Sequence, residues 1–182
     1  LNYIKEYNPL LTIIHSTIPV GTTKKICNEI DSSCVHSPVR GIHPNLKEGI
    51  ETFVKFIGYN SLNDLHLTGK HYDQLGIKYE WVENTDSTEI AKMLSTTYYG
   101  LCIAFHGEMK KMCDEFNIDF EVINKWTETY NSGYNNLGIN NVQRPNLFPP
   151  EGSIGGHCVI PNTELLMKQF KSKAFDLIVD YK

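Results

Sequence analysis

The hydrophobic residues in the first half of the chain gather in short, β-branched runs separated by polar turns. Four such runs predict strands at 10–16, 34–36, 52–58 and 78–82. Two helices are expected between them, at 22–30 and 61–75. Thr22 or Thr23 can cap the first helix, and Gly76 ends the second. Strands that alternate with helices predict half of an α/β sheet, largely parallel.

The pattern changes after Ser87, where apolar residues recur every three or four positions. This stripe predicts one long amphipathic helix whose core-facing residues are Ile90, Leu94, Tyr98, Leu101, Phe105, Met109, Met112 and Phe116. Gly100 and Gly107 indicate close packing of this helix against another. Further helices are expected at 119–131 and 163–172. The second half of the chain is therefore predicted to be helical.

Charge and composition narrow the range of functions. The 182 residues include 17 basic and 21 acidic side chains, a net charge of −4, and 41% are hydrophobic. These values are typical of a globular protein with a sizeable core. The basic residues form no cluster, which argues against nucleic acid or an anionic membrane as a partner. With no bilayer-length apolar run and no signal-peptide pattern, we expect a cytoplasmic protein.

The cysteines and histidines show no metal-site spacing. Five cysteines are scattered along the chain without a Cys-x-x-Cys pair, at positions 27, 34, 102, 113 and 158. An odd, scattered set fits free thiols in a reducing compartment rather than a disulfide framework or a zinc site. We therefore expect no metal. No Gly-x-Gly-x-x-Gly turn, the fingerprint of dinucleotide binding, follows any predicted strand.

One cysteine lies in a glycine-rich loop whose composition favours a catalytic role. Three glycines, at positions 152, 155 and 156, precede Cys158, and two prolines precede the loop. Glycine lets a ligand approach the main chain closely, and a thiol presented there is suited to nucleophilic catalysis. The alternative is a tight turn around a buried, inert thiol, because free cysteine is among the most buried residue types.

Four segments in order carry a family resemblance. They are Ser-Thr-Ile-Pro-Val-Gly-Thr-Thr at 16–23, Thr-Glu-Ile-Ala-Lys at 88–92, the stretch 107–115, and Gly-Gly-His-Cys at 155–158. Together they resemble the nucleotide-sugar 6-dehydrogenases, the UDP-glucose/GDP-mannose dehydrogenase family. The resemblance implies the C-terminal half of a Rossmann-like NAD-binding domain at 1–85. It also implies an all-α central domain, similar to that of 6-phosphogluconate dehydrogenase, at 86–182, which pairs two subunits through its long helix.

The resemblance implies that the family's first βαβ units and its C-terminal domain lie outside these 182 residues. It also implies an activity, the two-step NAD-dependent oxidation of a UDP-sugar C6 alcohol to the acid in polysaccharide biosynthesis. Cys158 would be the nucleophile that adds to the intermediate aldehyde, Lys92 would stabilise the oxyanion, and Thr17 would order water and cofactor. The implied substrate contacts are Gly155, Gly156, Asn162 and Thr96. The implied cofactor contacts are Ser16, Thr17 and Pro19.

Three positions depart from the family pattern. Val39 stands where the family has Glu, Thr96 where it has Asn, and Asn162 where it has Asp. Asn162 keeps the hydrogen-bonding shape of Asp, but it carries no charge and accepts no proton at neutral pH. A second interpretation is therefore open, a non-catalytic sugar-nucleotide-binding or dimerisation module derived from the family. A third, a hydroxyacid-type dehydrogenase, transfers one hydride and needs no Gly-Gly-x-Cys loop.

Overall fold

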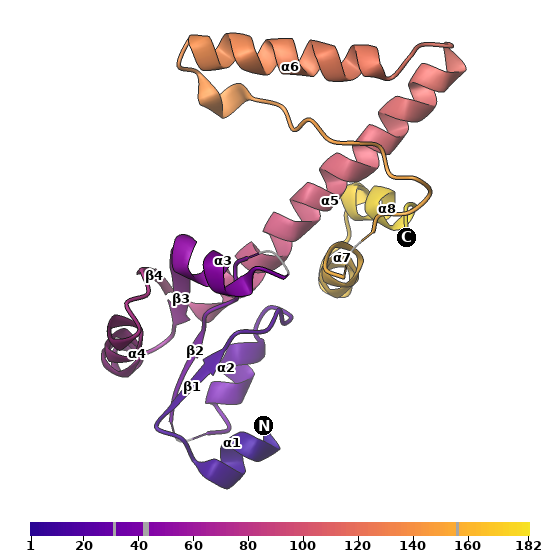
Figure 1. The fold of residues 1–182 in the computed structure, drawn as a ribbon. Coiled ribbons are helices and arrows are strands. Elements are labelled where there is room, and N and C mark those ends of the chain that lie inside the picture. The colour runs from indigo at the N-terminus through magenta and orange to yellow at the C-terminus, as the bar shows by residue number, and fades with distance from the viewer. Residues whose placement is uncertain (31, 42–43, 156) are drawn as a thin grey trace. The chain divides into compact units, whose positions relative to one another are not determined.

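The computed structural model describes residues 1–30, 32–41, 44–155 and 157–182, which form two compact units. The first unit, Leu1–Leu94, combines a sheet with helices, and the second, Ser95–Lys182, is helical (Figure 1). The long helix α5 (Thr85–Glu115) runs through the boundary between them. The expected α/β class, with a long helix after the sheet, is confirmed.

The sheet of the first unit contains four strands within the described ranges. In sheet order they are β1 (Leu11–Ile14), β2 (Ser33–His36), β3 (Lys55–Tyr59) and β4 (Tyr79–Glu83). The β1–β2 and β3–β4 pairs are parallel, whereas β2 and β3 meet antiparallel through His36 and Gly58. The predicted strands are therefore present, and the sheet is largely parallel as expected.

The first unit also contains the helices α1 (Asn2–Tyr7), α2 (Thr22–Cys27), α3 (Leu46–Thr52) and α4 (Leu62–Gln74). α4 packs against β1, β2 and β3, and α2 packs against β2 (Figure 1). The core joins Val35 and Ile57 of the sheet to Tyr72 of α4. The sequence pattern predicts α2 and α4 but misses α1 and α3, because the described residues of those two helices bury almost no side chain and show no apolar periodicity.

The second unit contains the rest of α5, together with α6 (Glu121–Asn136), the short 3₁₀ helix η1 (Asn140–Val142), α7 (Val159–Met167) and α8 (Lys173–Val179). Its core gathers Ala104, Ile154, Val159, Ile160, Ile178 and Tyr181. The helix predicted at 163–172 is wrong in its bounds, because α7 begins at Val159. Val159 and Ile160 are buried, and Pro161 is tolerated in a first helical turn, where its missing N–H has no partner to lose.

The face of α5 that packs inside the second unit is not the predicted one. Tyr98, Phe105 and Met112 of the apolar stripe are exposed, and so are Ile90 and Leu94 nearer its start. The buried face instead carries small or polar residues, namely Thr97, Gly100, Ala104, His106, Gly107 and Cys113. The predicted core stripe is therefore wrong at these exposed positions, although its member Leu101 does pack against the core. Small residues on the other face let the chain's own C-terminal segment approach the helix.

The glycines of α5 show this approach directly. A Cβ built on Gly100 would lie 2.3 Å from Val159 Cγ1, and one on Gly107 would lie 2.5 Å from Tyr181 Cζ. The predicted close packing is therefore confirmed, but its partner is this chain.

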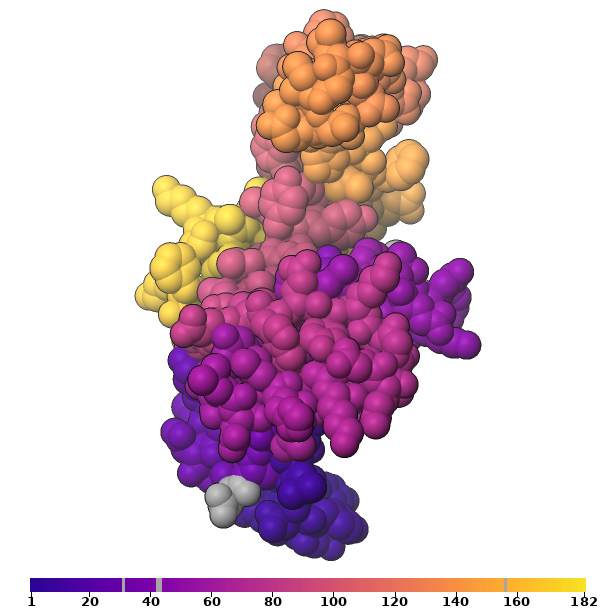
Figure 2. Space-filling view, turned by 90° about the vertical axis from the view of Figure 1, so that its left-hand side faces the viewer, coloured from indigo at the N-terminus to yellow at the C-terminus, as the bar shows by residue number. Residues whose placement is uncertain are grey.

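Helix α6 is open to solvent. None of its described residues is buried, and in the space-filling view its orange residues are freely visible (Figure 2). Within the described ranges, no helix is both long and apolar enough to cross a membrane.

Candidate active site

The turn after β1 lies at the carboxyl end of that strand and holds the predicted cofactor contacts. Ser16 is exposed, whereas Thr17 and Pro19 are half-buried. The Pro19 carbonyl accepts hydrogen bonds from the N–H and hydroxyl of Thr22, at 3.2 and 2.6 Å, which closes the turn at the start of α2. Ligands of open α/β sheets bind outside the carboxyl ends of the strands, so this turn is placed where a cofactor contact is expected.

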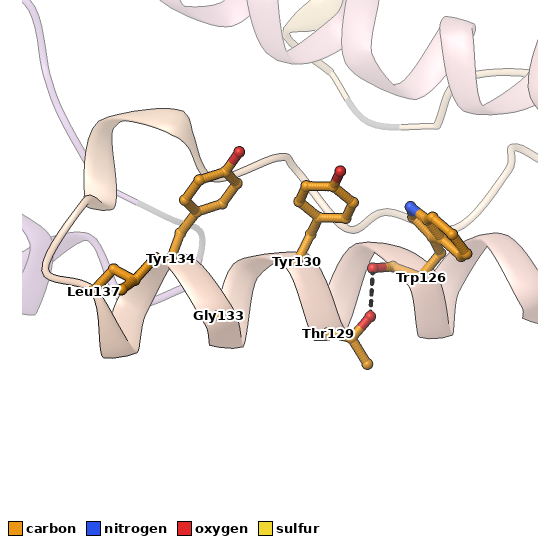
Figure 3. A pocket seen from close by; sticks show the side chains of 6 residues that line it. All are labelled: Trp126, Thr129, Tyr130, Gly133, Tyr134 and Leu137. Atoms are coloured by element: carbon orange, nitrogen blue, oxygen red, sulfur yellow. Dashed lines mark hydrogen bonds between the residues drawn. The ribbon is translucent and has the colours of Figure 1, made fainter.

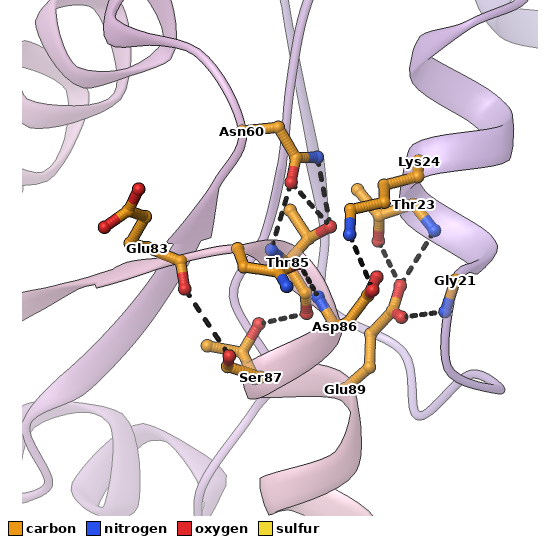
Figure 4. A network of polar contacts seen from close by, with 11 residues as sticks. Gly21, Thr23, Lys24, Asn60, Glu83, Thr85, Asp86, Ser87 and Glu89 are labelled. Carbon is orange, nitrogen blue, oxygen red and sulfur yellow. Dashed lines mark hydrogen bonds and ion pairs between the residues drawn. The ribbon is translucent and has the colours of Figure 1, made fainter.

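A buried carboxylate caps α2. The N-cap is Gly21, whose φ of 86° lies in the left-handed region. The fully buried Glu89 of α5 accepts hydrogen bonds from the Gly21 N–H at 2.6 Å, the Thr23 N–H at 2.8 Å and the Thr23 hydroxyl at 2.6 Å (Figure 4). A negative charge is favoured at a helix N-terminus. The prediction of Thr22 or Thr23 as the cap is wrong, because a carboxylate distant in sequence takes that role.

The first turn of α5 is fastened to the first unit at two further points. Lys24 forms an ion pair with Asp86, with 2.6 Å between Nζ and Oδ2. Asn60 Nδ2 donates to Thr85 Oγ1 at 3.0 Å, and the Thr85 N–H donates to Asn60 Oδ1 at 3.2 Å (Figure 4). These contacts fix the start of the helix that carries Lys92.

His36 ties the β1 turn to the same helix. Its buried ring has Nε2 3.1 Å from the Ser16 carbonyl oxygen and Nδ1 2.9 Å from Thr88 Oγ1. A carbonyl only accepts, so we assign the proton to Nε2. Burial lowers the pKa of His36, although the Ser16 carbonyl and the charge of Glu89 act to raise it. The neutral ring at pH 7 therefore holds the Ser16 peptide in a fixed orientation.

Two lysines converge on the loop after β2. Lys92 Nζ donates to the Val39 carbonyl at 2.8 Å, and the buried Lys55 donates to the Ser37 and Pro38 carbonyls at 3.1 and 3.2 Å. Burial, with a smaller effect from the charge of Lys92, lowers the pKa of Lys55 to about 8. Positive charge is thus concentrated around the main chain of residues 37–39.

The loop also connects Lys92 with the β1 turn. The Val39 N–H donates to the His15 carbonyl at 3.3 Å, and the Ser37 N–H donates to the Ile14 carbonyl at 2.9 Å. Lys92 therefore lies at the same carboxyl edge of the sheet as the turn that begins at Ser16.

In the second unit, Cys158 is exposed between two anchored segments. On one side, the buried Ile154 donates its N–H to the Tyr181 carbonyl at 2.7 Å. On the other, Cys158 is the N-cap of α7, and its carbonyl accepts from the Asn162 N–H at 3.1 Å. The alternative of a buried thiol at Cys158 is therefore wrong, and its reactivity stays a prediction.

The implied substrate contacts differ in their surroundings. A Cβ on Gly155 would meet no heavy atom of the described residues within 4 Å, so space is open beside its main chain. Asn162 is buried in the first turn of α7, and Thr96 is half-buried in α5. Gly156 lies outside the described residues.

Tyr181, whose carbonyl binds the Ile154 N–H, anchors the loop that carries Cys158. Its ring fits against Gly107, and its hydroxyl donates to Glu108 Oε1 at 2.6 Å. The Lys111 ammonium lies 4.5 Å from the centre of the ring and 2.7 Å from Glu108 Oε1. Residues of the 107–115 segment, which contributed to the family resemblance, therefore hold Tyr181, whose carbonyl binds the Ile154 N–H.

A separate groove of about 420 Å³ runs along α6. The aromatic side chains of Trp126, Tyr130 and Tyr134 project from the same side of the helix (Figure 3). The Arg144 guanidinium stacks on the rings of Tyr130 and Tyr134, at 4.6 and 5.2 Å from their centres. The groove's lining includes no carboxylate, histidine or thiol among the described residues, so it is an apolar surface rather than a reaction centre.

The predicted site residues thus fall into two groups. Ser16, Thr17, Pro19 and Lys92 lie in the first unit, and Thr96, Gly155, Cys158 and Asn162 lie in the second. The meeting of Lys92 and Cys158 across one cleft stays a prediction. In the described part of the chain, no three His, Cys, Asp or Glu side chains are grouped to hold a metal ion.

A family model decides the relationship. The model of the UDP-glucose/GDP-mannose dehydrogenase family, central domain, matches residues 86–179, more than half of the chain. The chain belongs to this family. The resemblance drawn from the four sequence segments is confirmed.

Curated relatives of this nucleotide-sugar dehydrogenase family extend the match. A UDP-N-acetyl-D-mannosamine dehydrogenase of Methanococcus vannielii is 27% identical over 161 residues, which cover 87% of this chain and 34% of the relative. One of Methanocaldococcus jannaschii is 25% identical over 175 residues, covering 93% and 38%. The chain therefore spans little more than a third of the length of these relatives.

Solved structures show the same fold. The UDP-D-ManNAc dehydrogenase of Pyrococcus horikoshii matches with a TM-score of 0.72 at 23% identity, covering 92% of this chain and 40% of that one. An NDP-N-acetyl-D-galactosaminuronic acid dehydrogenase of Methanosarcina mazei matches with a TM-score of 0.71 at 20% identity, covering 92% and 39%.

Proposed function

We propose that the chain carries the nucleophilic half of a NAD-dependent dehydrogenase that oxidises the C6 alcohol of a UDP-sugar to the acid. The observation that carries the proposal is the exposed Cys158, placed at the start of α7 in a loop anchored on both sides. Family membership and the UDP-N-acetyl-D-mannosamine dehydrogenases among the relatives support it. In this proposal residues 1–85 belong to the cofactor-binding domain and 86–182 to the central domain.

The thiol solves a chemical problem. An alcohol reaches the acid only after two hydride transfers, and the intermediate aldehyde must be activated for the second. Cys158 sulfur adds to the aldehyde carbon and forms a thiohemiacetal, which the second oxidation converts to a thioester. Water then hydrolyses the thioester, which releases the acid and restores the thiol. The open space beside Gly155 suits close approach of the sugar.

Lys92 and the β1 turn supply charge and orientation. The Lys92 ammonium, which already binds the Val39 carbonyl, stabilises the oxyanion that develops on the sugar C6 oxygen. When bound, NAD accepts the hydride in both oxidations. The exposed Ser16 and the half-buried Thr17 and Pro19 at the carboxyl edge of the sheet fit its nicotinamide end, and Thr17 also orders the water. Gly156, Asn162 and Thr96 complete the proposed substrate contacts.

The departures from the family pattern concern the last step. Neither Val39 nor Asn162 carries a carboxylate, and Asn162 is buried beside the Cys158 carbonyl. Hydrolysis of the thioester is the step for which a general base matters most. We therefore expect nucleotide-sugar binding and thiol addition to be kept, and hydrolysis to be slow.

Calorimetric titration tests the binding. UDP-N-acetylmannosamine is added to the purified chain and to variants Lys92→Ala and Lys110→Ala, with NAD titrated separately. We expect the nucleotide sugar to bind, and Lys92→Ala to weaken that binding about tenfold, or about 1.4 kcal/mol. Lys110→Ala, at an exposed surface lysine of α5, leaves it unchanged. Binding of neither ligand to the unsubstituted chain would contradict the proposal and favour a module without substrate affinity.

We also propose that two copies of the chain pair through the exposed face of α5. Tyr98, Phe105 and Met112 recur every seven residues and so share one helix face, and all three are exposed. A contiguous exposed apolar surface marks an interaction site, and a self-complementary helix face is suited to a two-fold dimer.

Light scattering after size exclusion measures the mass of this assembly. We expect a dimer for the unsubstituted chain and a monomer for Phe105→Glu, because a charge at the centre of the stripe is unfavourable when buried. Phe148→Glu is the matched control, since Phe148 is also an exposed phenylalanine but lies outside α5. A dimer that survives Phe105→Glu, or a monomer without any substitution, would rule out this interface.

A further inference from the structure

Two thiols meet away from the candidate active site, near the amino end of β2. Cys27 is the last residue of α2, and Cys34 is the second residue of β2. The Cys27 thiol donates a hydrogen bond to the Cys34 carbonyl, with 3.4 Å between sulfur and oxygen. Six residues separate the two cysteines in sequence, and the fold brings their side chains together.

The pair lines a polar cavity. Its volume is about 350 Å³, and its walls include Cys27, Cys34, Asn60, Ser61, Asn63 and Asp64. Cys34 is 1% exposed, whereas Cys27 is only half-buried. A small solute that enters the cavity therefore reaches the Cys27 sulfur first.

The more accessible thiol, Cys27, is also the more acidic of the two. Interaction with the Cys34 side chain lowers the pKa of Cys27, although burial and the charge of Asp64 oppose it. Interaction with the Cys27 side chain, together with burial, raises the pKa of Cys34. Because the thiolate is the reactive form of cysteine, Cys27 is suited to react first and Cys34 to react second.

We propose that Cys27 and Cys34 form an oxidisable pair, which a peroxide converts to a disulfide. The Cys27 sulfur attacks one peroxide oxygen, the O–O bond breaks, and hydroxide leaves, which gives a sulfenic acid. The Cys34 sulfur then attacks the sulfenic sulfur, the S–S bond forms, and the sulfenic oxygen leaves as water with the Cys34 proton. In sum, two thiols are oxidised and one hydrogen peroxide is reduced to two waters. A thiol reductant reverses the change by disulfide exchange.

The disulfide would join the end of α2 to β2 without involving Cys158. The proposal therefore stands independently of the dehydrogenase activity.

Peptide mass spectrometry tests the pair. Trypsin cleaves after Lys25 and Arg40, so one peptide, 26–40, holds both thiols. The purified chain with Cys158→Ser is treated with stoichiometric hydrogen peroxide, unfolded, alkylated with iodoacetamide and digested. We expect peptide 26–40 to be unalkylated and lighter than its reduced form by the mass of two hydrogens, and dithiothreitol to restore the reduced form. Alkylation of both cysteines after peroxide treatment would overturn the proposal.

Single variants assign the order of reaction. With Cys34→Ser, we expect Cys27 to stop at the sulfenic acid, which dimedone labels. With Cys27→Ser, the buried Cys34 stays reduced and unlabelled. Cys102→Ser, at a half-buried cysteine of α5, is the matched control and leaves disulfide formation unchanged. Dimedone labelling of Cys34 in the Cys27→Ser variant, at the rate seen for Cys27, would overturn the assignment.

Discussion

Glu89→Ala is expected to destabilise the first unit by about 3–5 kcal/mol, because it leaves buried donors without an acceptor. The Gly21 and Thr23 N–H groups and the Thr23 hydroxyl all donate to this one carboxylate. Gly21 has no side chain that could replace it as a cap. The variant should loosen the start of α2, and with it the turn that carries Ser16 and Thr17.

Urea unfolding followed by Trp81 fluorescence measures this loss. The Trp126→Phe background leaves Trp81, in β4 of the first unit, as the sole tryptophan. Asp86→Asn is the control, since it removes a carboxylate from the same helix turn but breaks only a part-exposed ion pair with Lys24. The control should cost less than about 1 kcal/mol. Equal effects of the two substitutions would show that Glu89 does not act as the cap.

Gly107→Ala is expected to destabilise the second unit by about 2 kcal/mol, even though alanine favours a helix over glycine by about 1 kcal/mol. The new methyl group would lie 2.5 Å from Tyr181 Cζ and from its hydroxyl oxygen. Tyr181 must then move, and its bonds to Glu108 and to the Ile154 N–H are strained or lost. Because Ile154 anchors the loop, Cys158 should lose its fixed position.

Hydrogen exchange of the Ile154 amide reports this displacement, and we expect its protection to fall with the stability of the unit. Gly133→Ala is the matched control. Gly133 also lies inside a helix, α6, and a Cβ there would meet no heavy atom of the described residues within 4 Å. The control should stabilise the unit by about 1 kcal/mol. Stabilisation by both substitutions would show that Tyr181 does not depend on the close approach at Gly107.

The strands and long helices could be predicted because their periodicity is local. A short apolar run such as Leu11–Ile14 predicts a strand from a few residues, and the apolar residues that recur every three or four positions after Ser87 predict a helix. The buried face of α5 could not be predicted from the same steps. Gly100 and Ala104 contribute little hydrophobicity, yet their small size decides which side another segment can approach. The large residues of the stripe, such as Phe105, dominate the hydrophobic periodicity, but they lie on the face of α5 that is exposed within this unit.

The candidate site shows the same division. Cys158 and Lys92 could be proposed as candidates because the residues around them form recognisable segments. Glu89 and Tyr181 could not be assigned a role, because the partners of each are distant in sequence: Glu89 binds Gly21 and Thr23, and Tyr181 binds Ile154. A long-range contact between a side chain and the main chain leaves no spacing pattern in the sequence. Pairs such as Cys27 and Cys34 are hidden for the same reason.

The proposed addition of Cys158 to the aldehyde of a UDP-sugar, with the help of Lys92, can be observed by ¹³C NMR. The purified chain is mixed with a UDP-N-acetylhexosamine 6-aldehyde labelled at C6. Thiol addition converts the labelled carbon to a thiohemiacetal, which has its own resonance and needs no cofactor. We expect this resonance for the unsubstituted chain, a weaker one for Lys92→Ala, and none for Cys158→Ser. The same resonance at full strength in Cys158→Ser would show that Cys158 is not the group that adds to the aldehyde.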